Sequence, residues 1–152
     1  GSGSRENDFL GDLRIEGAVA DGDDATANWT ASAGSNYQCV DEAVGAYNDD
    51  TDYISSSTAA QQNLETFAAI GASGISGDPK FAMTEVLARD DGSNDVKLLA
   101  KHSASTGSYT PAPATLSVSY KWKQGFFPVN PSTAAAWTLS EINAASFGVE
   151  TV

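Results

Sequence analysis

The chain has few of the residues that build metal clusters and catalytic triads, since its 152 residues include one cysteine, Cys39, and one histidine, His102. A single cysteine cannot form an intrachain disulfide, and one thiol with one imidazole does not make a cysteine- or histidine-based metal cluster. A Ser-His-Asp triad would have to recruit His102 from the end of an expected strand, where a solvent-facing or strand-end histidine is the simpler interpretation. We therefore expect a buried, inert Cys39 and predict no catalytic residue and no cofactor.

Positive charge is also scarce, with 8 basic residues against 20 acidic ones and a formal net charge of −12. A surface of this sign repels phosphate backbones and anionic lipid headgroups, which argues against nucleic-acid and membrane partners. No apolar run approaches the roughly 20 residues that a helix needs to cross a bilayer. The sequence therefore predicts neither a nucleic-acid-binding protein nor a membrane-spanning helix.

The acidic residues gather in two loop clusters that raise the question of calcium binding. Calcium takes oxygen ligands, but neither cluster has the twelve-residue spacing of an EF-hand loop with its distal glutamate. Two interpretations stay open, a calcium site and solvated loop charge, and the second is favoured. The candidate ligands are Asp21, Asp23 and Asp24 in the first cluster and Asp49, Asp50 and Asp52 in the second.

Short alternating segments separated by glycine-rich and Asp-rich turns dominate the rest of the chain. Seven or eight strands of this kind predict an all-β fold, an antiparallel two-sheet sandwich, with jelly-roll connections as one possibility. The length suits a single domain over residues 1–152, in which residues 1–8 are a linker or the end of an upstream domain. One short helix is expected near the C-terminus, where Thr138 and Glu141 have the spacing of a capping box.

Several pairings follow from the alternation along the chain. We expect Lys80–Arg89 and Val96–His102 to form an antiparallel hairpin, Tyr37–Glu42 to be extended, and the C-terminal strand from Phe147 to pair with an N-terminal strand around Leu10–Glu16. The apolar members of these strands predict one shared core. Its expected residues are Leu13, Ile15, Val40, Phe67, Phe81, Met83, Leu87, Val118, Phe147 and Val149.

Aromatic side chains offer a second kind of candidate site, because exposed rings on a sandwich are a common platform for carbohydrate. Trp29, Trp122 and Trp137 lie in apolar contexts and are expected in or near the core. Tyr47 and Tyr53 lie in a polar, acidic loop and are the better candidates for exposed ligand-binding rings.

Five segments spread over nearly the whole chain carry a likeness to a known family: Asn7–Ile15, Asp21-Gly22-Asp23 with Trp29-Thr30, Val40-Asp41-Glu42, Asp52–Thr58 and the final stretch Asn130–Glu150. With these segments the chain resembles a poorly characterised family of tailed-bacteriophage virion proteins. In that family such a segment often follows a laminin-G-like or concanavalin-like jelly-roll domain, and Gly1–Asp12 looks like the junction. The resemblance implies a location in the virion and brings no catalytic motif with it.

The resemblance implies a non-enzymatic structural protein of a tailed-phage virion, displayed on head or tail as a decoration, fibre or adhesion component. Its expected partners are other virion proteins and further copies of itself in a homo-oligomer or symmetric assembly, and a host surface glycan is a further candidate. The alternative is a carbohydrate-binding module of an adhesin or secreted bacterial protein. A glycan hydrolase is the third class, and it would need two carboxylates placed in one cleft.

Overall fold

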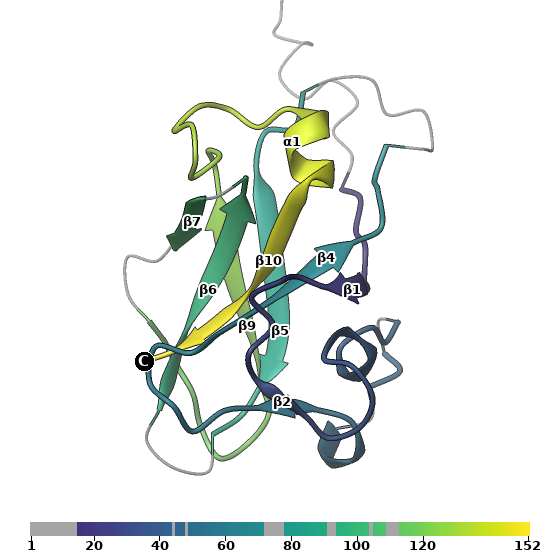
Figure 1. The fold of residues 1–152 in the computed structure, drawn as a ribbon, viewed down its shortest axis with the longest axis vertical. Helices are drawn as coiled ribbons and strands as arrows, with labels where there is room; N and C mark the ends of the chain where they lie inside the picture. Colours follow the sequence, from purple (N-terminus) through teal and green to yellow (C-terminus); the bar gives the residue numbers. More distant parts are fainter. Residues whose placement is uncertain are drawn as a thin grey trace, which may run out of the picture.

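The computed structural model describes residues 15–43, 45–47, 49–71, 78–90, 94–103, 105–108 and 113–152 (Figure 1). Short strands predominate, with two 3-10 turns and one α-helix. In chain order the elements are β1 (Ala20–Asp23), β2 (Thr30–Ala31), η1 (Tyr37–Cys39), η2 (Asp49–Thr51), β3 (Ile54–Ser55), β4 (Gln62–Phe67), β5 (Ala82–Ala88), β6 (Asp95–His102), β7 (Ser105–Ser108), β8 (Ala114–Thr115), β9 (Lys121–Phe127), α1 (Leu139–Asn143) and β10 (Ala145–Thr151).

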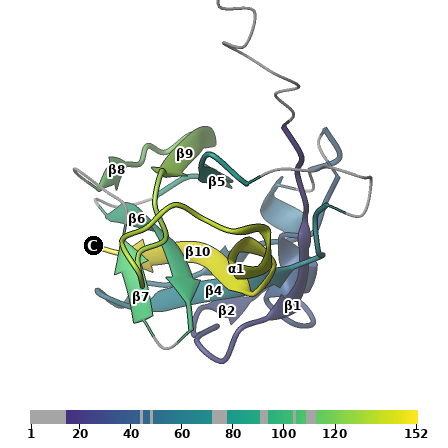
Figure 2. The same cartoon turned by 90° about the horizontal axis from the view of Figure 1, so that it is seen from above.

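The strands form two layers of antiparallel sheet. The larger sheet has the order β1-β4-β10-β6-β7, with β8 paired to another part of β6. The second layer is the pair β5-β9, and Figure 2 shows it above the larger sheet with α1 near one end. A further small pair is β2-β3, and β2 lies below β1 and β4 in Figure 1. The all-β prediction with one short C-terminal helix is therefore confirmed.

The core between the layers is built from a few large rings and several small side chains. Phe127, Trp137 and Phe147 lie with ring centroids 5.9 to 6.2 Å apart along the contacts Phe127–Phe147 and Trp137–Phe147. The Trp137 indole N–H donates to the Phe127 carbonyl at 2.8 Å, so the buried ring keeps no unpaired donor. Three alanines, at positions 82, 100 and 145, complete this cluster and leave the rings room to interlock.

The layers approach closely where Gly125 of β9 faces β6. A Cβ at Gly125 would lie 2.8 Å from Cβ of Leu98 and 3.5 Å from Cγ2 of Thr84. Only small residues fit this part of the interface, because Leu98 already fills it. The small members of β5, Ala82 and Thr84, therefore face inward, and the larger members of that strand face out.

The inward direction of Ala82 and Thr84 overturns part of the predicted core. Lys80–Arg89 does alternate, but the face with the larger side chains is the exposed one. Phe147 and Val149 are buried as predicted, and Phe67 and Leu87 are half-buried. Leu13 lies outside the described residues. The predicted core residues that are exposed are Ile15, Val40, Phe81, Met83 and Val118.

The predicted strand partners are wrong in two places. β5 does not form a hairpin with β6; it pairs with β9, from Ala82 opposite Phe127 to Ala88 opposite Lys121. β10 lies between β4 and β6, so both of its edges are taken and the expected N-terminal partner has no place beside it. A turn that links two layers carries the same glycine and aspartate signals as a hairpin turn, and sequence alone does not separate them.

Two local predictions also need correction. Residues 1–14, which include the expected linker and the first part of the expected strand around Leu10–Glu16, lie outside the described residues. Ile15 and Glu16 are not in a strand, and the first strand begins at Ala20. The segment expected to be extended around Cys39 is a 3-10 turn, Tyr37–Cys39. Cys39 is buried there as predicted, with its thiol 3.0 Å from the Ala33 carbonyl.

The predicted capping box at α1 is confirmed. The Thr138 hydroxyl accepts from the backbone N–H of Glu141 at 3.2 Å, and the Glu141 carboxylate accepts from the backbone N–H of Thr138 at 2.8 Å. Both bonds satisfy helix-end donors that a short helix cannot satisfy internally.

Replacing Thr138 with alanine should lower the free energy of unfolding by about 1 kcal/mol, because the N-cap acceptor is lost. Ser140→Ala is the matched control, since it removes an exposed hydroxyl from the same helix. Urea denaturation of both variants measures the difference. Equal stability of the two variants would show that the cap contributes nothing.

Candidate functional site

Large apolar side chains project from the outer side of the β5-β9 pair, the side turned away from the core. Adjacent residues of a strand point to opposite faces, so Phe127 enters the core and Phe126 must point outward. The register sets Met83 opposite Phe126 and Leu87 opposite Trp122. We call this surface the outer face; its apolar side chains are Phe81, Met83, Leu87, Trp122 and Phe126.

Four of these five side chains are exposed to an unusual degree for their size, and Leu87 is half-buried. Trp122 is 46% exposed, Phe126 45% and Phe81 44%. The Phe81 and Phe126 rings lie 6.1 Å apart at one end of the outer face. Single exposed apolar residues are ordinary on soluble proteins, but a contiguous group marks a binding surface.

A polar pair separates the two apolar ends of the outer face. Gln124 donates to the Glu85 carboxylate at 2.8 Å, and the two residues are direct cross-strand partners. Their amide and carboxylate groups give the middle of the surface hydrogen-bonding capacity between the phenylalanine end and the Trp122 end. The outer face can therefore hold a ligand or partner with mixed apolar and polar character.

The loop that contains Tyr47 and η2 extends the outer face at its Trp122 end. Tyr47 packs edge-on against Trp122, with ring centroids 5.1 Å apart. Asp50 fixes this loop in place, because its carboxylate pairs with Arg89 at 2.8 Å and accepts from the Tyr120 hydroxyl at 3.0 Å. The Arg89 guanidinium also lies over the Tyr120 ring, 5.3 Å from its centroid.

The structure brings together only some of the aromatic candidates. Tyr47 joins the outer face and is 39% exposed, whereas Tyr53 is exposed beside β3. Trp137 is buried as expected, and Trp29 is half-buried with its indole N–H donating to the Gln61 carbonyl at 2.9 Å. Trp122 is a correction, because it was expected in or near the core. The adjacent phenylalanines at 126 and 127 were the sequence signal that one side of this strand faces solvent.

The first calcium candidates do not share a common centre. Asp21 accepts from the Thr66 hydroxyl at 3.1 Å, and Asp23 accepts from the Tyr37 backbone N–H at 2.6 Å. Asp24 forms an ion pair with Lys101 at 2.6 Å. Burial acts to raise the pKa of Asp24, but hydrogen bonds from Lys101, Ser146 and Thr26 outweigh it and hold the pKa below its ordinary value.

The second cluster of calcium candidates, Asp49, Asp50 and Asp52, is not gathered around one centre either. Asp50 is engaged by Arg89 and Tyr120, and Asp52 is half-buried at the end of this loop. Asp49 begins the turn η2. Within the described ranges, no group of three or more His, Cys, Asp or Glu side chains is arranged to hold a metal ion.

A buried polar network joins β4 to the loop that carries β2. The Asn63 amide donates to the Glu65 carboxylate at 2.5 Å, and its oxygen accepts from Asn36 at 2.5 Å and from the Trp29 backbone N–H at 3.2 Å. Asn36 also donates to the Trp29 carbonyl at 2.9 Å. The sequence pattern gave no sign of this network, because Glu65 lies in a segment expected only to be a strand.

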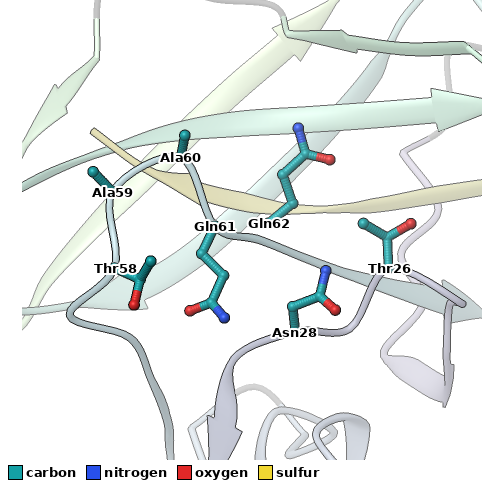
Figure 3. Close-up of a pocket in the computed structure, with 7 residues that line it drawn as sticks. All are labelled: Thr26, Asn28, Thr58, Ala59, Ala60, Gln61 and Gln62. Atoms are coloured by element: carbon teal, nitrogen blue, oxygen red, sulfur yellow. The ribbon is translucent and has the colours of Figure 1, made fainter.

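A polar depression of about 410 Å³ opens beside the start of β4 (Figure 3). Gln61 and Gln62 point to opposite sides of the chain there (Figure 3). Their amides already have partners inside the protein: Ser56 donates to Gln61, and Gln62 donates to Glu150 at 2.6 Å. Because these groups are satisfied internally, the depression is a weaker candidate than the outer face. It is lined by Thr26, Asn28, Thr58, Ala59, Ala60, Gln61 and Gln62.

His102 ends β6, as its position in the sequence predicted, and is half-buried. Its Nδ1 lies 3.0 Å from the Asn130 amide nitrogen, and its ring packs against Trp137 with centroids 6.5 Å apart. These contacts fit a structural role at the edge of the core.

Comparison with protein-family models, with curated proteins and with solved structures gives no match to this chain. No helix in the described part of the chain has the length and hydropathy needed to cross a membrane. The geometry of the outer face is therefore the main structural guide to function.

Proposed function

We propose that the protein is a structural, non-enzymatic component of a tailed-phage virion, displayed on the head or tail, and that the outer face is its contact surface. The observation that carries the contact surface is the row of exposed side chains on β5 and β9, with Phe126 and Trp122 each nearly half exposed. An isolated molecule gains nothing from exposing these rings, whereas covering them stabilises a contact by about 25 cal/mol per Å² of apolar surface. The virion location rests on the sequence resemblance.

A second candidate, a carbohydrate-binding module, is favoured by one specific observation. The Trp122 ring, against which Tyr47 packs, lies on the same face of β9 as Gln124, two residues along the strand, and Gln124 bonds to Glu85. Rings that stack on a sugar face, beside an amide and a carboxylate that bond its hydroxyls, are a common arrangement in sugar sites. The outer face would then bind a host surface glycan in place of a neighbouring virion protein.

The double variant Trp122→Thr with Phe126→Thr tests the contact surface. It should fold normally, because both side chains are exposed and threonine suits a strand. We expect the amount of this variant that sediments with the phage particles to be at least tenfold lower than the amount of the wild type. Val129→Thr is the control, because Val129 is an exposed apolar residue beyond the end of β9.

Two other results would count against the proposal. Equal retention of the double variant and the control would remove the outer face from the particle contact. Binding of the wild type to immobilised host polysaccharide, lost in the double variant while particle retention persists, would establish the carbohydrate function instead.

A further inference from the structure

β5 forms an open edge of the second layer. Within the described ranges, β5 and β9 pair only with each other, and the backbone of Ala82–Ala88 bonds to no other element. In an antiparallel pair, only alternate residues of a strand bond to a given neighbour. The remaining N–H and C=O groups of β5 therefore point away from β9, where a further strand can pair with them.

This edge lacks the features that protect the other edge strands of the described fold. β1 has four residues and a register shift between Ala20 and Gly22, and β7 also has four residues. β8 lies beside β9 (Figure 2), where Lys123 donates to the Thr115 carbonyl. β5 pairs with β9 over seven residues without a register shift and contains no proline. A long, regular edge of this kind is normally covered, which indicates that a strand belongs beside β5.

The second layer covers only part of the larger sheet. The larger sheet has five strands in a row, whereas the second layer has two, and β5 lies on the side of that layer that faces β1 (Figure 2). Phe67 of β4 and Ile142 of α1 pack against the core cluster but stay only partly buried. The Phe67 ring lies 5.8 Å from that of Phe147, so it points toward the second layer. A third strand beside β5 would cover these two side chains.

The sequence contains a strand-like segment that has no partner. Phe9–Ile15 alternates, with Phe9, Leu13 and Ile15 on one side of an extended chain. The partner expected for it, β10, is paired on both edges. Residues 9–14 lie outside the described residues, and Ile15, the first described residue, is 87% exposed. Six residues in a strand span about 20 Å, which is nearly the length of β5.

The position of Ile15 brings this segment to β5. The Glu16 carboxylate accepts from the Gly71 backbone N–H at 3.1 Å, and Gly71 belongs to the connection that leads from β4 into β5. In both views the stretch that leads into β1 runs on the side of β5 away from β9 (Figures 1 and 2). Because this stretch lies toward the start of β5 in Figure 1, the residues before it would run along β5 in the opposite direction.

We propose that Phe9–Arg14 adds to the open edge of β5 as an antiparallel strand of the same molecule and completes the second layer. Backbone hydrogen bonds to the edge would supply affinity, and alternate side chains would fix the register. Phe9 and Leu13 would face the larger sheet and cover Phe67 and Ile142. The opposite side of the segment, which carries one charge of each sign, would continue the outer face. This inference does not depend on the proposed virion function.

Amide hydrogen exchange of the whole chain, followed residue by residue by NMR, tests the contact. In the wild type, the β5 amides that point away from β9 and the amides of residues 9–14 should exchange at least tenfold more slowly than unstructured amides. Phe9→Asp with Leu13→Asp removes the apolar side of the segment. This double variant should lose the protection of the edge amides, while the β5 amides bonded to β9 stay protected.

Leu10→Asp is the matched control, because it makes the same kind of change on the opposite side of the segment and should leave the edge amides protected. Sedimentation velocity on the same samples identifies the molecule that donates the strand. Protection in a monomer supports the inference. Protection that appears only in a dimer overturns it, as do edge amides that exchange freely in the wild type or an equal loss of protection in Leu10→Asp. None of these outcomes changes the particle-binding test of the outer face, so the proposed function stands or falls separately.

Discussion

Replacing Glu65 with glutamine should stabilise the protein at neutral and alkaline pH. Glu65 is 4% exposed and lies directly opposite Asp23 in the pairing of β4 with β1. Two carboxylates opposite each other on neighbouring strands repel when both are ionised. One Glu65 oxygen accepts from Asn63, and the other, which is also buried, has no hydrogen-bond donor among the described residues.

Protonation of Glu65 removes the repulsion between the two carboxylates. Burial raises the pKa of Glu65 to about 8; the Asn63 amide opposes the rise, and Asp23 adds to it. Other charges nearby do not reverse the effect. Asp24 adds a further negative field, and the only cation bonded to this region, Lys101, is engaged by Asp24 within the described structure. At neutral pH the neutral form of Glu65 is therefore the favoured one.

The sign of the pH dependence follows from this difference. The unfolded chain releases the Glu65 proton near its ordinary pKa of 4.5, whereas the folded chain keeps it up to about pH 8. The stabilising contribution of the bound proton is complete below pH 4.5 and declines as the pH rises toward 8. The slope contributed by this one group approaches about 1.4 kcal/mol per pH unit.

Glu65→Gln supplies a permanently neutral side chain of nearly the same shape, whose amide can donate toward Asp23. We expect about 2 kcal/mol or more of added stability at pH 8, and a flatter dependence between pH 5 and 8. Glu85→Gln is the matched control, because it removes the same charge from an exposed position. Urea denaturation at pH 5, 6.5 and 8 measures all three proteins. A destabilised Glu65→Gln protein with the wild-type pH slope would mean that Glu65 is ionised in the fold.

How much of this structure the sequence can predict depends on the range of the interactions involved. The capping box of Thr138 and Glu141 is local, and its prediction is confirmed. The strand character of Lys80–Arg89 is equally local and is also confirmed. The partner of that strand is not local, because β9 begins at Lys121, 33 residues after β5 ends at Ala88. Local alternation therefore located strands better than it paired them.

In the candidate site, too, local features were predicted and long-range contacts were not. Tyr47 was identified from its polar surroundings, but its contact with Trp122 depends on the fold of a distant strand. The outer face was missed because β5 has apolar residues on both sides, and the larger ones were assigned to the core. Gly125 and Leu98 determine which side of β5 faces the core, since the space beside them fits only small side chains such as Ala82 and Thr84. That constraint exists only once the two layers are packed.

Position 148 should be the most sensitive glycine in the part of the chain that the structure describes. Gly148 lies in β10, the central strand, opposite Leu64 of β4 and Leu99 of β6. A Cβ added there would lie 1.9 Å from the Asn63 carbonyl oxygen and 2.9 Å from Cα of Leu64. These are backbone atoms, which cannot rotate away as a flexible side chain can. Glycine is therefore required at this position because the space between β10 and β4 is too small for a Cβ atom.

Gly148→Ala should lower the free energy of unfolding by about 3 kcal/mol or more, a large part of the roughly 5–15 kcal/mol that stabilises a domain. The cost arises because β10 must move away from β4, and both edges of β10 carry ladder hydrogen bonds. Gly17→Ala is the control, since no atom lies within 4 Å of its added Cβ, and it should change stability by less than about 0.5 kcal/mol. Urea denaturation of the two variants compares them directly. A Gly148→Ala midpoint close to that of Gly17→Ala would show that β10 and β4 do not pair in this register.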